Sequence, residues 1–512
     1  MSGIADPTGS DGAGSDDGHL GIEFGPAESG GVVVSDPIER SQFLLSTPGP
    51  VDLRDADPGA FRFPADAAVR FRTDRLTLET VVSVCVRDDA GDLLARTEHF
   101  AEESFDDGTY SVELFAPIKL YLRVDAPFRV VSDATHTRIE FDGATDVTVG
   151  ARSHHKRPAA TVTTSDRPRD AMRAVSLLGS ALKTTSVERS YPTLRGHPPL
   201  VERGDSFDAP AGLAPPETGV RIELPATRRH VYAAAPLAYY LGARVVPGAT
   251  PRVVTDTGFA HDLAPDGDFE TGVERLLKRT FFLDCLTRTE GYYQVDLHER
   301  TALESDLGSA VDLDFADLYG RSIGAQLEAY LDVPYRTVEA HAPTWKLTAH
   351  VSPAASNVEL LPFLANDLAV VTTPSAEPTT GSTTQAEAVE GFLRRPSASP
   401  SAPGRPPSPT PSRDREPAPE TWTFPRSTDA GSPQAGSGRT RTYVRPPETD
   451  AIEQAWVGPG IPIGASKASG AAYRNRLDRD PVEGDIGITV VCNDPRMAAE
   501  REAVESVYGS RE

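Results

Sequence analysis

The sequence has 512 residues, 38% of them hydrophobic, and its 75 acidic against 51 basic side chains give a formal net charge of −24. A chain of this length has room for about three domains of ordinary size. Because nucleic acids and anionic lipid surfaces are bound by clustered cations, the charge argues against both classes of partner.

Lysine is almost absent from the basic residues, which are nearly all arginine. It occurs only at Lys119, Lys156, Lys183, Lys278, Lys346 and Lys467. An acidic surface with few lysines is typical of halophilic proteins, because concentrated salt screens the repulsion between carboxylates. An ordinary acidic protein from a GC-rich genome would also favour arginine, and that alternative stays open.

The expected location is the cytoplasm. The chain has three cysteines, Cys85, Cys285 and Cys492, at wide spacing and without a CxxC motif, which predicts neither a disulfide framework nor a zinc site. Residues 1–18 lack the basic start and apolar run of a signal peptide. The most apolar stretch, residues 231–246, contains Pro236, Gly242 and Arg244 and is too short to span a bilayer.

The first third of the chain is predicted to be a tail and a β domain. Residues 1–19 are Gly-, Ser- and Asp-rich and are expected to be a disordered acidic tail. From residue 20 to 165, short β-type runs alternate with turn signals such as DDAGD at residues 88–92. The pattern predicts an all-β sandwich-like domain.

Residues 166–373 change to mixed patterns, which predict an α/β or α+β domain. Apolar residues recur at helical spacing in several segments, and short β-type runs lie between them. Helices are expected at about residues 171–183, 230–241, 269–288 and 315–329 and, in part, at 357–366. Strands are expected at 220–224, 243–246, 252–255, 345–350 and 368–371.

The last part of the chain begins with a spacer. Residues 374–440 are Pro-, Ser- and Thr-rich and are expected to be a disordered linker, because they carry too little apolar surface to form a core. Residues 441–512 are predicted to be partly ordered. Within them, residues 485–492 (DIGITVVC) predict a buried strand and residues 496–508 a helix, the first βα unit of an incomplete parallel-sheet domain.

The only candidate catalytic residues are Asp296, His298 and Glu299, in the segment EGYYQVDLHER. On a strand, Asp296 and His298 would share one face, as an acid–base pair or two metal ligands could. No second ligand cluster accompanies them, and charged residues after a helix are usually solvated. Therefore no catalytic, metal or cofactor site is assigned.

Three other motifs have ordinary structural interpretations. The Gly-rich stretch GPGIPIGASKASG (residues 458–470) lacks the GK[ST] order of a phosphate-binding loop, so a turn-rich loop is expected. Cys285 lies among apolar helical residues and is expected to behave as a small hydrophobic side chain. The run His154-His155-Lys156-Arg157 is expected at a solvated edge or in a linker.

Four segments carry a family resemblance. They are YAAAPLAYYLGARVVPG (232–248), RTFFLDCLTRTEGYYQVDLHER (279–300), AWVGPGIPIGASKASGAAYRNRLDR (455–479) and ITVVCNDPRMAAE (488–500). They resemble a family of uncharacterised haloarchaeal proteins with a C-terminal caspase-like, CHAT-type domain. The resemblance implies that this domain starts near residue 488 and that its catalytic His and Cys would come from later strands.

Two functional hypotheses follow. In the first, the chain is a truncated, catalytically incomplete form of a peptidase-like protein, and its N-terminal parts are a sensing or interaction module for an unidentified protein or small molecule. In the second, residues 166–373 form an independent hydrolase or ligand-binding enzyme that uses Asp296, His298 or Glu299. Convergence of these side chains with a third polar group in a pocket would favour the enzyme, and splayed, exposed side chains would favour the module.

Overall fold

A computed structural model of the chain describes residues 21–308, 313–373 and 443–477. The predicted tail 1–19, linker 374–440 and strand and helix at 485–492 and 496–508, with Cys492, lie outside these ranges. Contacts divide the chain into two compact units, residues 1–470 and 471–512. The elements below belong to the first unit, except that helix α10 (Gly470–Leu477) begins at the boundary.

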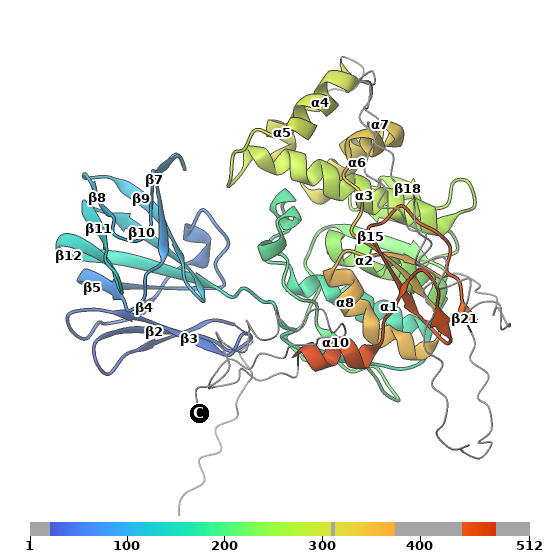
Figure 1. Cartoon of the computed structure of the whole chain (residues 1–512), viewed down its shortest axis with the longest axis horizontal. Helices are drawn as coiled ribbons and strands as arrows, with labels where there is room; N and C mark the ends of the chain where they lie inside the picture. The colour runs from blue at the N-terminus through green and yellow to red at the C-terminus, as the bar shows by residue number, and fades with distance from the viewer. Residues whose placement is uncertain (1–20, 309–312, 374–442, 478–512) are drawn as a thin grey trace, which may run out of the picture. The chain divides into compact units, whose positions relative to one another are not determined.

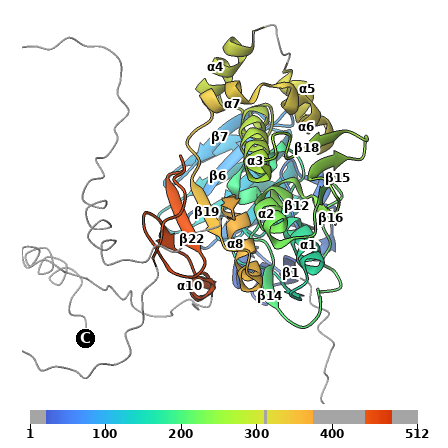
Figure 2. The same ribbon diagram turned by 90° about the vertical axis from the view of Figure 1, so that its right-hand side faces the viewer.

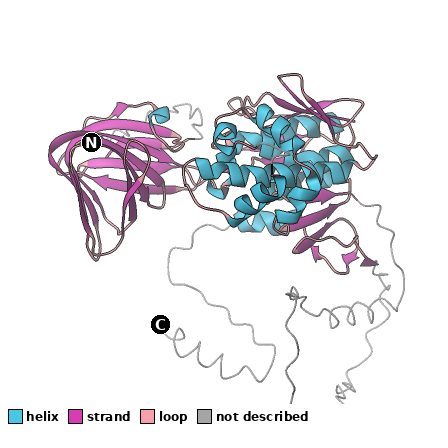
Figure 3. Ribbon diagram, turned by 90° about the horizontal axis from the view of Figure 1, so that it is seen from above, coloured by secondary structure: helices cyan, strands magenta, loops and turns pink. Residues whose placement is uncertain are grey.

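The N-terminal region is built almost wholly from antiparallel strands (Figures 1 and 3). Hydrogen bonds join them into one 12-stranded sheet with the path β1-β2-β3-β5-β12-β10-β9-β6-β7, and β4, β8 and β11 branch from this path. The strands are β1 (Glu23–Pro26), β2 (Gly31–Asp36), β3 (Ser41–Ser46), β4 (Arg54–Asp55), β5 (Ala67–Leu78), β6 (Ser83–Arg87), β7 (Leu93–Thr97), β8 (Glu102–Phe105), β9 (Thr109–Phe115), β10 (Lys119–Asp125), β11 (Phe128–Ser132) and β12 (Thr137–Arg152).

Strand β12 lies at the centre of this sheet. It pairs with β5 along one edge. Along its other edge, residues 137–141 pair with β11 and residues 147–152 pair with β10. The register with β5 shifts between Glu140 and Thr145, which lets the strand bend. One buried core joins Val34 and Leu45, from β2 and β3, to Val112 and Leu122, from β9 and β10. The predicted sandwich-like all-β region is confirmed.

The described part of the chain from residue 161 contains the α-helices and four small sheets. Strands β13 (Thr161–Thr164) and β14 (Leu200–Arg203) pair in parallel. A four-stranded sheet has the order β16 (Arg244–Pro247), β15 (Val220–Leu224), β17 (Arg252–Thr255) and β18 (Ala260–Asp262). The helices are α1 (Pro168–Leu177), α2 (Arg228–Leu241), α3 (Phe269–Thr287), α4 (His298–Leu307), α5 (Phe315–Tyr319), α6 (Ile323–Asp332), α7 (Tyr335–His341) and α8 (Leu361–Asn366), with short 3-10 turns such as η3 (Val187–Ser190).

Local sequence signals explain the two central helices. Helix α2 begins after Thr227, whose hydroxyl oxygen accepts a hydrogen bond from the His230 N–H, and it ends at Gly242 in the left-handed region at φ 56°. Helix α3 begins after Asp268, whose carboxylate accepts from the backbone N–H and the hydroxyl of Thr271. The apolar side of α3 then packs against α2, α5, α6 and α7, so that this helix is the centre of the region.

A second four-stranded sheet is wholly parallel, in the order β20 (Val370–Thr372), β19 (Leu347–Val351), β22 (Glu453–Val457) and β24 (Ser466–Lys467). Figure 2 shows β19 and β22 side by side, with α8 nearby. Two residues in each of β21 (Tyr443–Val444) and β23 (Ile461–Pro462) also pair in parallel. Thus the segment after residue 442 completes a sheet that begins before residue 374.

The predicted multidomain α+β class is confirmed, and one local prediction needs correction. The helix expected at 315–329 is broken into α5 and α6 at Gly320, Arg321 and Ser322, where the Ser322 hydroxyl oxygen caps α6 by accepting from the Ala325 N–H. The segment 357–366, expected to be helical in part, is a 3-10 turn (Ala355–Leu360) followed by α8. Among the described helices, none combines the length and apolar character needed to cross a membrane.

Candidate functional site

The structure does not bring the predicted candidates Asp296, His298 and Glu299 together in a pocket. No strand forms here: His298 and Glu299 are the first two residues of α4, and Asp296 lies in the preceding loop. All three side chains are exposed, and none makes a hydrogen bond or ion pair with any residue the structure describes. The physical reason is the spacing of Leu303 and Leu307, which bury one side of α4 and leave its first turn in solvent.

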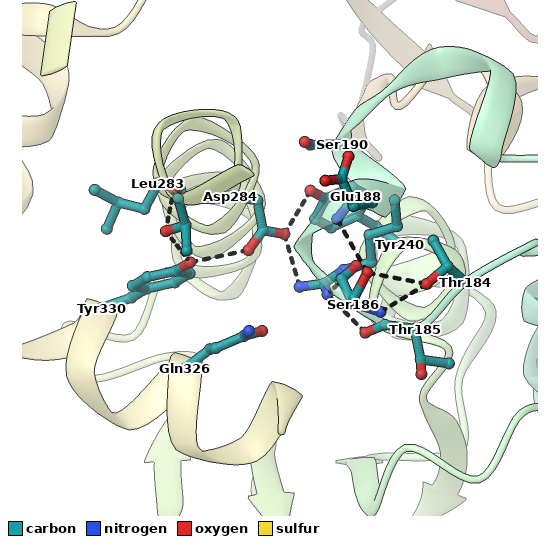
Figure 4. A network of polar contacts seen from close by, with 12 residues as sticks. Thr184, Thr185, Ser186, Glu188, Ser190, Tyr240, Leu283, Asp284, Gln326 and Tyr330 are labelled. Carbon is teal, nitrogen blue, oxygen red and sulfur yellow. Dashed lines mark hydrogen bonds and ion pairs between the residues drawn. The ribbon is translucent and has the colours of Figure 1, made fainter. Parts of the chain in front are cut away.

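The main buried polar cluster lies instead between η3, α2, α3 and α6 (Figure 4). The Arg189 guanidinium lies 2.7 Å from a carboxylate oxygen of Asp284, and both side chains are 0% exposed. The Tyr240 hydroxyl donates to Asp284 at 2.6 Å, and the Tyr330 hydroxyl donates to its other oxygen at 3.1 Å. Arg189 also donates to the backbone carbonyl of Thr185.

This cluster is suited to joining elements and not to chemistry. Burial raises the pKa of Asp284 to about 6, while the Arg189 guanidinium and the two phenols act in the opposite direction. Burial also raises the pKa of both Tyr240 and Tyr330 well above its usual value. Because every charged group is enclosed and partnered, no reacting molecule can approach. The feature of the sequence that indicates this buried cluster is Asp284, an acidic residue within the apolar run FFLDCL.

The thiol of Cys285, next along α3, is not activated. Burial raises its pKa, which favours the neutral thiol over the nucleophilic thiolate. The expectation that it acts as a small hydrophobic side chain agrees with this placement.

The histidine run lies in the segment that links β12 to β13, as one of the two expectations had it, but His155 is not solvated. His155 is buried, and burial lowers its pKa to about 3, so that the ring is neutral. It lies against Gly196, where the methyl group of an alanine would come within 2.3 Å of the His155 Nδ1 atom. His155 is therefore a packing residue.

The Gly-rich segment forms a self-contained loop. Lys467, the residue that would suit a phosphate-binding lysine, donates through its Nζ atom to the carbonyl oxygens of Gly458 and Gly460. The ammonium group therefore binds backbone carbonyls of its own loop. This agrees with the expectation that the segment is a turn-rich loop and not a phosphate-binding loop.

A cavity of about 470 Å³ lies beside the first half of α3. Its wall combines β18, the turn before α3, and the α6–α7 junction. The lining residues include His261 from β18, Arg275 and Arg279 from α3, Leu331 from α6 and Tyr335 from α7. Cavities of this size with apolar walls and a few convergent polar groups are the usual form of small-molecule sites.

The two arginines of this cavity stack on one aromatic ring. The guanidinium carbons of Arg275 and Arg279 lie 5.4 Å and 5.6 Å from the centroid of the Tyr335 ring. Neither guanidinium forms an ion pair with a carboxylate of the described residues, and the Nε atom of Arg279 is buried without a hydrogen-bond partner there. Burial lowers the pKa of Arg279, and the charge of Arg275 acts in the same direction.

Three carboxylates also line the cavity, and two of them accept hydrogen bonds from nearby residues. One oxygen of Asp262 accepts from the Ala264 N–H at 2.8 Å, and Asp268 caps α3 through Thr271. Burial and the Arg279 charge lower the pKa of His261, while Asp262 raises it. Asp266 is exposed. The lining of the cavity thus combines two guanidinium groups and an aromatic ring with the carboxylates of Asp262, Asp266 and Asp268.

Neither sequence-based candidates nor motifs point to this cavity. Its groups come from residues 261 to 335, and only the spacing of Arg275 and Arg279, one helical turn apart on α3, is visible in the sequence. Among the described residues, no group of three or more His, Cys, Asp or Glu side chains is placed to hold a metal ion.

Comparison with protein-family models, with curated proteins and with solved structures finds no match to this chain. The haloarchaeal resemblance therefore stays a prediction, and the functional argument depends on the geometry alone.

Proposed function

We propose that the chain is a recognition module that binds a small molecule in the cavity beside α3. The observation that carries the proposal is the convergence of Arg275, Arg279 and Tyr335 in one cavity, with both guanidinium groups free of carboxylate partners in the described chain. Such groups orient and retain a ligand without needing a nucleophile or a general base.

The exposed placement of Asp296, His298 and Glu299 supports the module over the alternative of an independent hydrolase. A general acid–base pair must lie within hydrogen-bond distance of the groups between which it transfers protons. Here the three side chains face solvent outside the cavity, without a third polar group beside them. By resemblance, the proposal extends to a sensing role beside a caspase-like, CHAT-type domain in a halophilic cytoplasm.

The test compares binding with turnover in the purified full chain. We expect small fragments to bind, as measured by ligand-observed NMR, and the binding to be lost in Leu331→Trp, which fills the cavity from α6. The matched control is Val295→Trp, which adds the same ring at a side chain that is 57% exposed. Both variants are first checked for an unchanged melting temperature.

Turnover is measured in parallel with ester, phosphomonoester and peptide substrates. We expect rates at background and equal in the wild type and in the double variant Asp296→Asn/His298→Gln. Hydrolysis that the double variant abolishes would establish the enzyme and reject the module. Fragment binding that Leu331→Trp leaves unchanged would likewise reject this cavity as the recognition site.

A further inference from the structure

We propose that the ligand of this cavity is a phosphate monoester of a small apolar or aromatic compound. The phosphate would lie between Arg275 and Arg279, and the apolar part would lie against Tyr335 and Leu331. This inference depends on the function proposed above and specifies the chemical class that the recognition module accepts.

The two arginines carry the first step. Both guanidinium groups come from α3 and line the cavity, and neither forms an ion pair with a carboxylate of the described residues. A phosphate dianion matches this pair in charge, and its oxygens match the planar donor groups of arginine in geometry. A carboxylate would neutralise only one of the two.

The buried donor of Arg279 carries the second step. Its Nε atom is enclosed and has no hydrogen-bond acceptor among the described residues. Buried donors in folded proteins nearly always have an acceptor, in the protein or in a bound molecule. A phosphate oxygen that enters the cavity beside this side chain would supply one.

The aromatic and aliphatic wall carries the third step. Both guanidinium groups lie over the Tyr335 ring, 5.4 Å and 5.6 Å from its centroid, and this contact restricts the two side chains before a ligand arrives. Leu276, Leu331 and Pro265 add apolar surface to the cavity. A free inorganic phosphate would leave this apolar surface uncovered, whereas the organic part of an ester would cover it.

The carboxylates of the lining oppose an anionic ligand. Those of Asp262 and Asp268 accept hydrogen bonds from nearby residues, whereas no hydrogen bond or ion pair to another described residue engages Asp266. Its removal should therefore strengthen the binding of an anion, which gives the test a change of opposite sign.

The experiment measures the Kd of the full chain, by calorimetry at constant KCl, for phenyl phosphate, benzoate, inorganic phosphate and benzyl alcohol. We expect phenyl phosphate to bind more tightly than each of the others. Arg279→Gln should weaken phenyl phosphate by about tenfold to a hundredfold, the effect typical of losing a charge-assisted hydrogen bond. Arg275→Gln should weaken it less, because that side chain is exposed.

Two further variants complete the design. Asp266→Asn should lower the Kd for phenyl phosphate, and Arg336→Gln should leave it unchanged, since Arg336 is an exposed arginine on α7 that does not line the cavity. The Kd values are compared only among variants whose melting temperature without ligand equals that of the wild type. If Arg279→Gln does not fold, Arg279→Lys replaces it.

The outcomes separate this inference from the function on which it depends. Benzoate or benzyl alcohol binding as tightly as phenyl phosphate, in a manner sensitive to Leu331→Trp, would overturn the phosphate assignment and leave the module intact. An equal loss of affinity in Arg336→Gln and Arg279→Gln would show nonspecific attraction and would also overturn it. Enzymatic turnover of phenyl phosphate that depends on His298 would overturn the proposed function itself.

Discussion

Asp284→Ala is expected to lower the free energy of unfolding by about 3–5 kcal/mol, which is typical of removing one partner from a buried ion pair. The variant would leave the Arg189 guanidinium, 0% exposed, without its carboxylate, and the hydroxyls of Tyr240 and Tyr330 without their acceptor. Urea denaturation at constant KCl, followed by circular dichroism, measures the change.

The matched control is Asp317→Ala, which breaks an ion pair to Arg321 whose side chains are half exposed. Surface pairs contribute about 0–1 kcal/mol, so this variant should unfold almost as the wild type does. The double variant Arg189→Met/Asp284→Leu should cost less than Asp284→Ala alone, because no unpaired charge stays buried. Equal losses for Asp284→Ala and Asp317→Ala would contradict the role assigned to the buried cluster.

Raising KCl from about 0.1 M to about 1 M should raise the melting temperature by several degrees. This change shortens the Debye length from about 10 Å to about 3 Å, and it therefore screens the repulsion within a chain of net charge −24. A gain of about 2 kcal/mol corresponds to about 4–8 °C for a domain of 150–250 residues. Thermal melts across a KCl series measure the slope.

Neutralising exposed carboxylates should reduce that slope. Asp74, Asp106 and Asp107 are exposed, and replacing all three by asparagine removes like charges without touching the core. The triple variant should melt higher than the wild type at low salt and respond less to KCl. A melting temperature that is flat or falls with salt would contradict the halophilic interpretation of the composition.

Elements with local determinants could be predicted from the sequence. The apolar spacing of α3, the glycine that ends α2 and the alternating strands of the N-terminal region depend on neighbours within a few residues. The strand on which Asp296 and His298 would share one face does not form. His298 instead begins the helix α4, whose buried residues Leu303 and Leu307 lie four residues apart.

The candidate site could not be predicted in the same way. His261, Arg275 and Tyr335 come from a strand, a helix and a second helix, and only tertiary packing brings them to one cavity. The buried pair depends on η3 reaching α3 across almost a hundred residues, and Arg189 has no local signal that distinguishes it from the surface arginines. The spacing of residues within one segment carries no information about which side chains from distant parts of the sequence it will contact.

The wholly parallel sheet constrains the order in which the protein can be made. Strand β19 is flanked by β20, which follows it closely, and by β22, which lies beyond residue 442. During synthesis, the ribosome therefore releases β19 with one open edge long before its second neighbour emerges. Until residues 453–457 arrive, that edge is open to unintended strand pairing, and the interval is a period in which a chaperone would be useful.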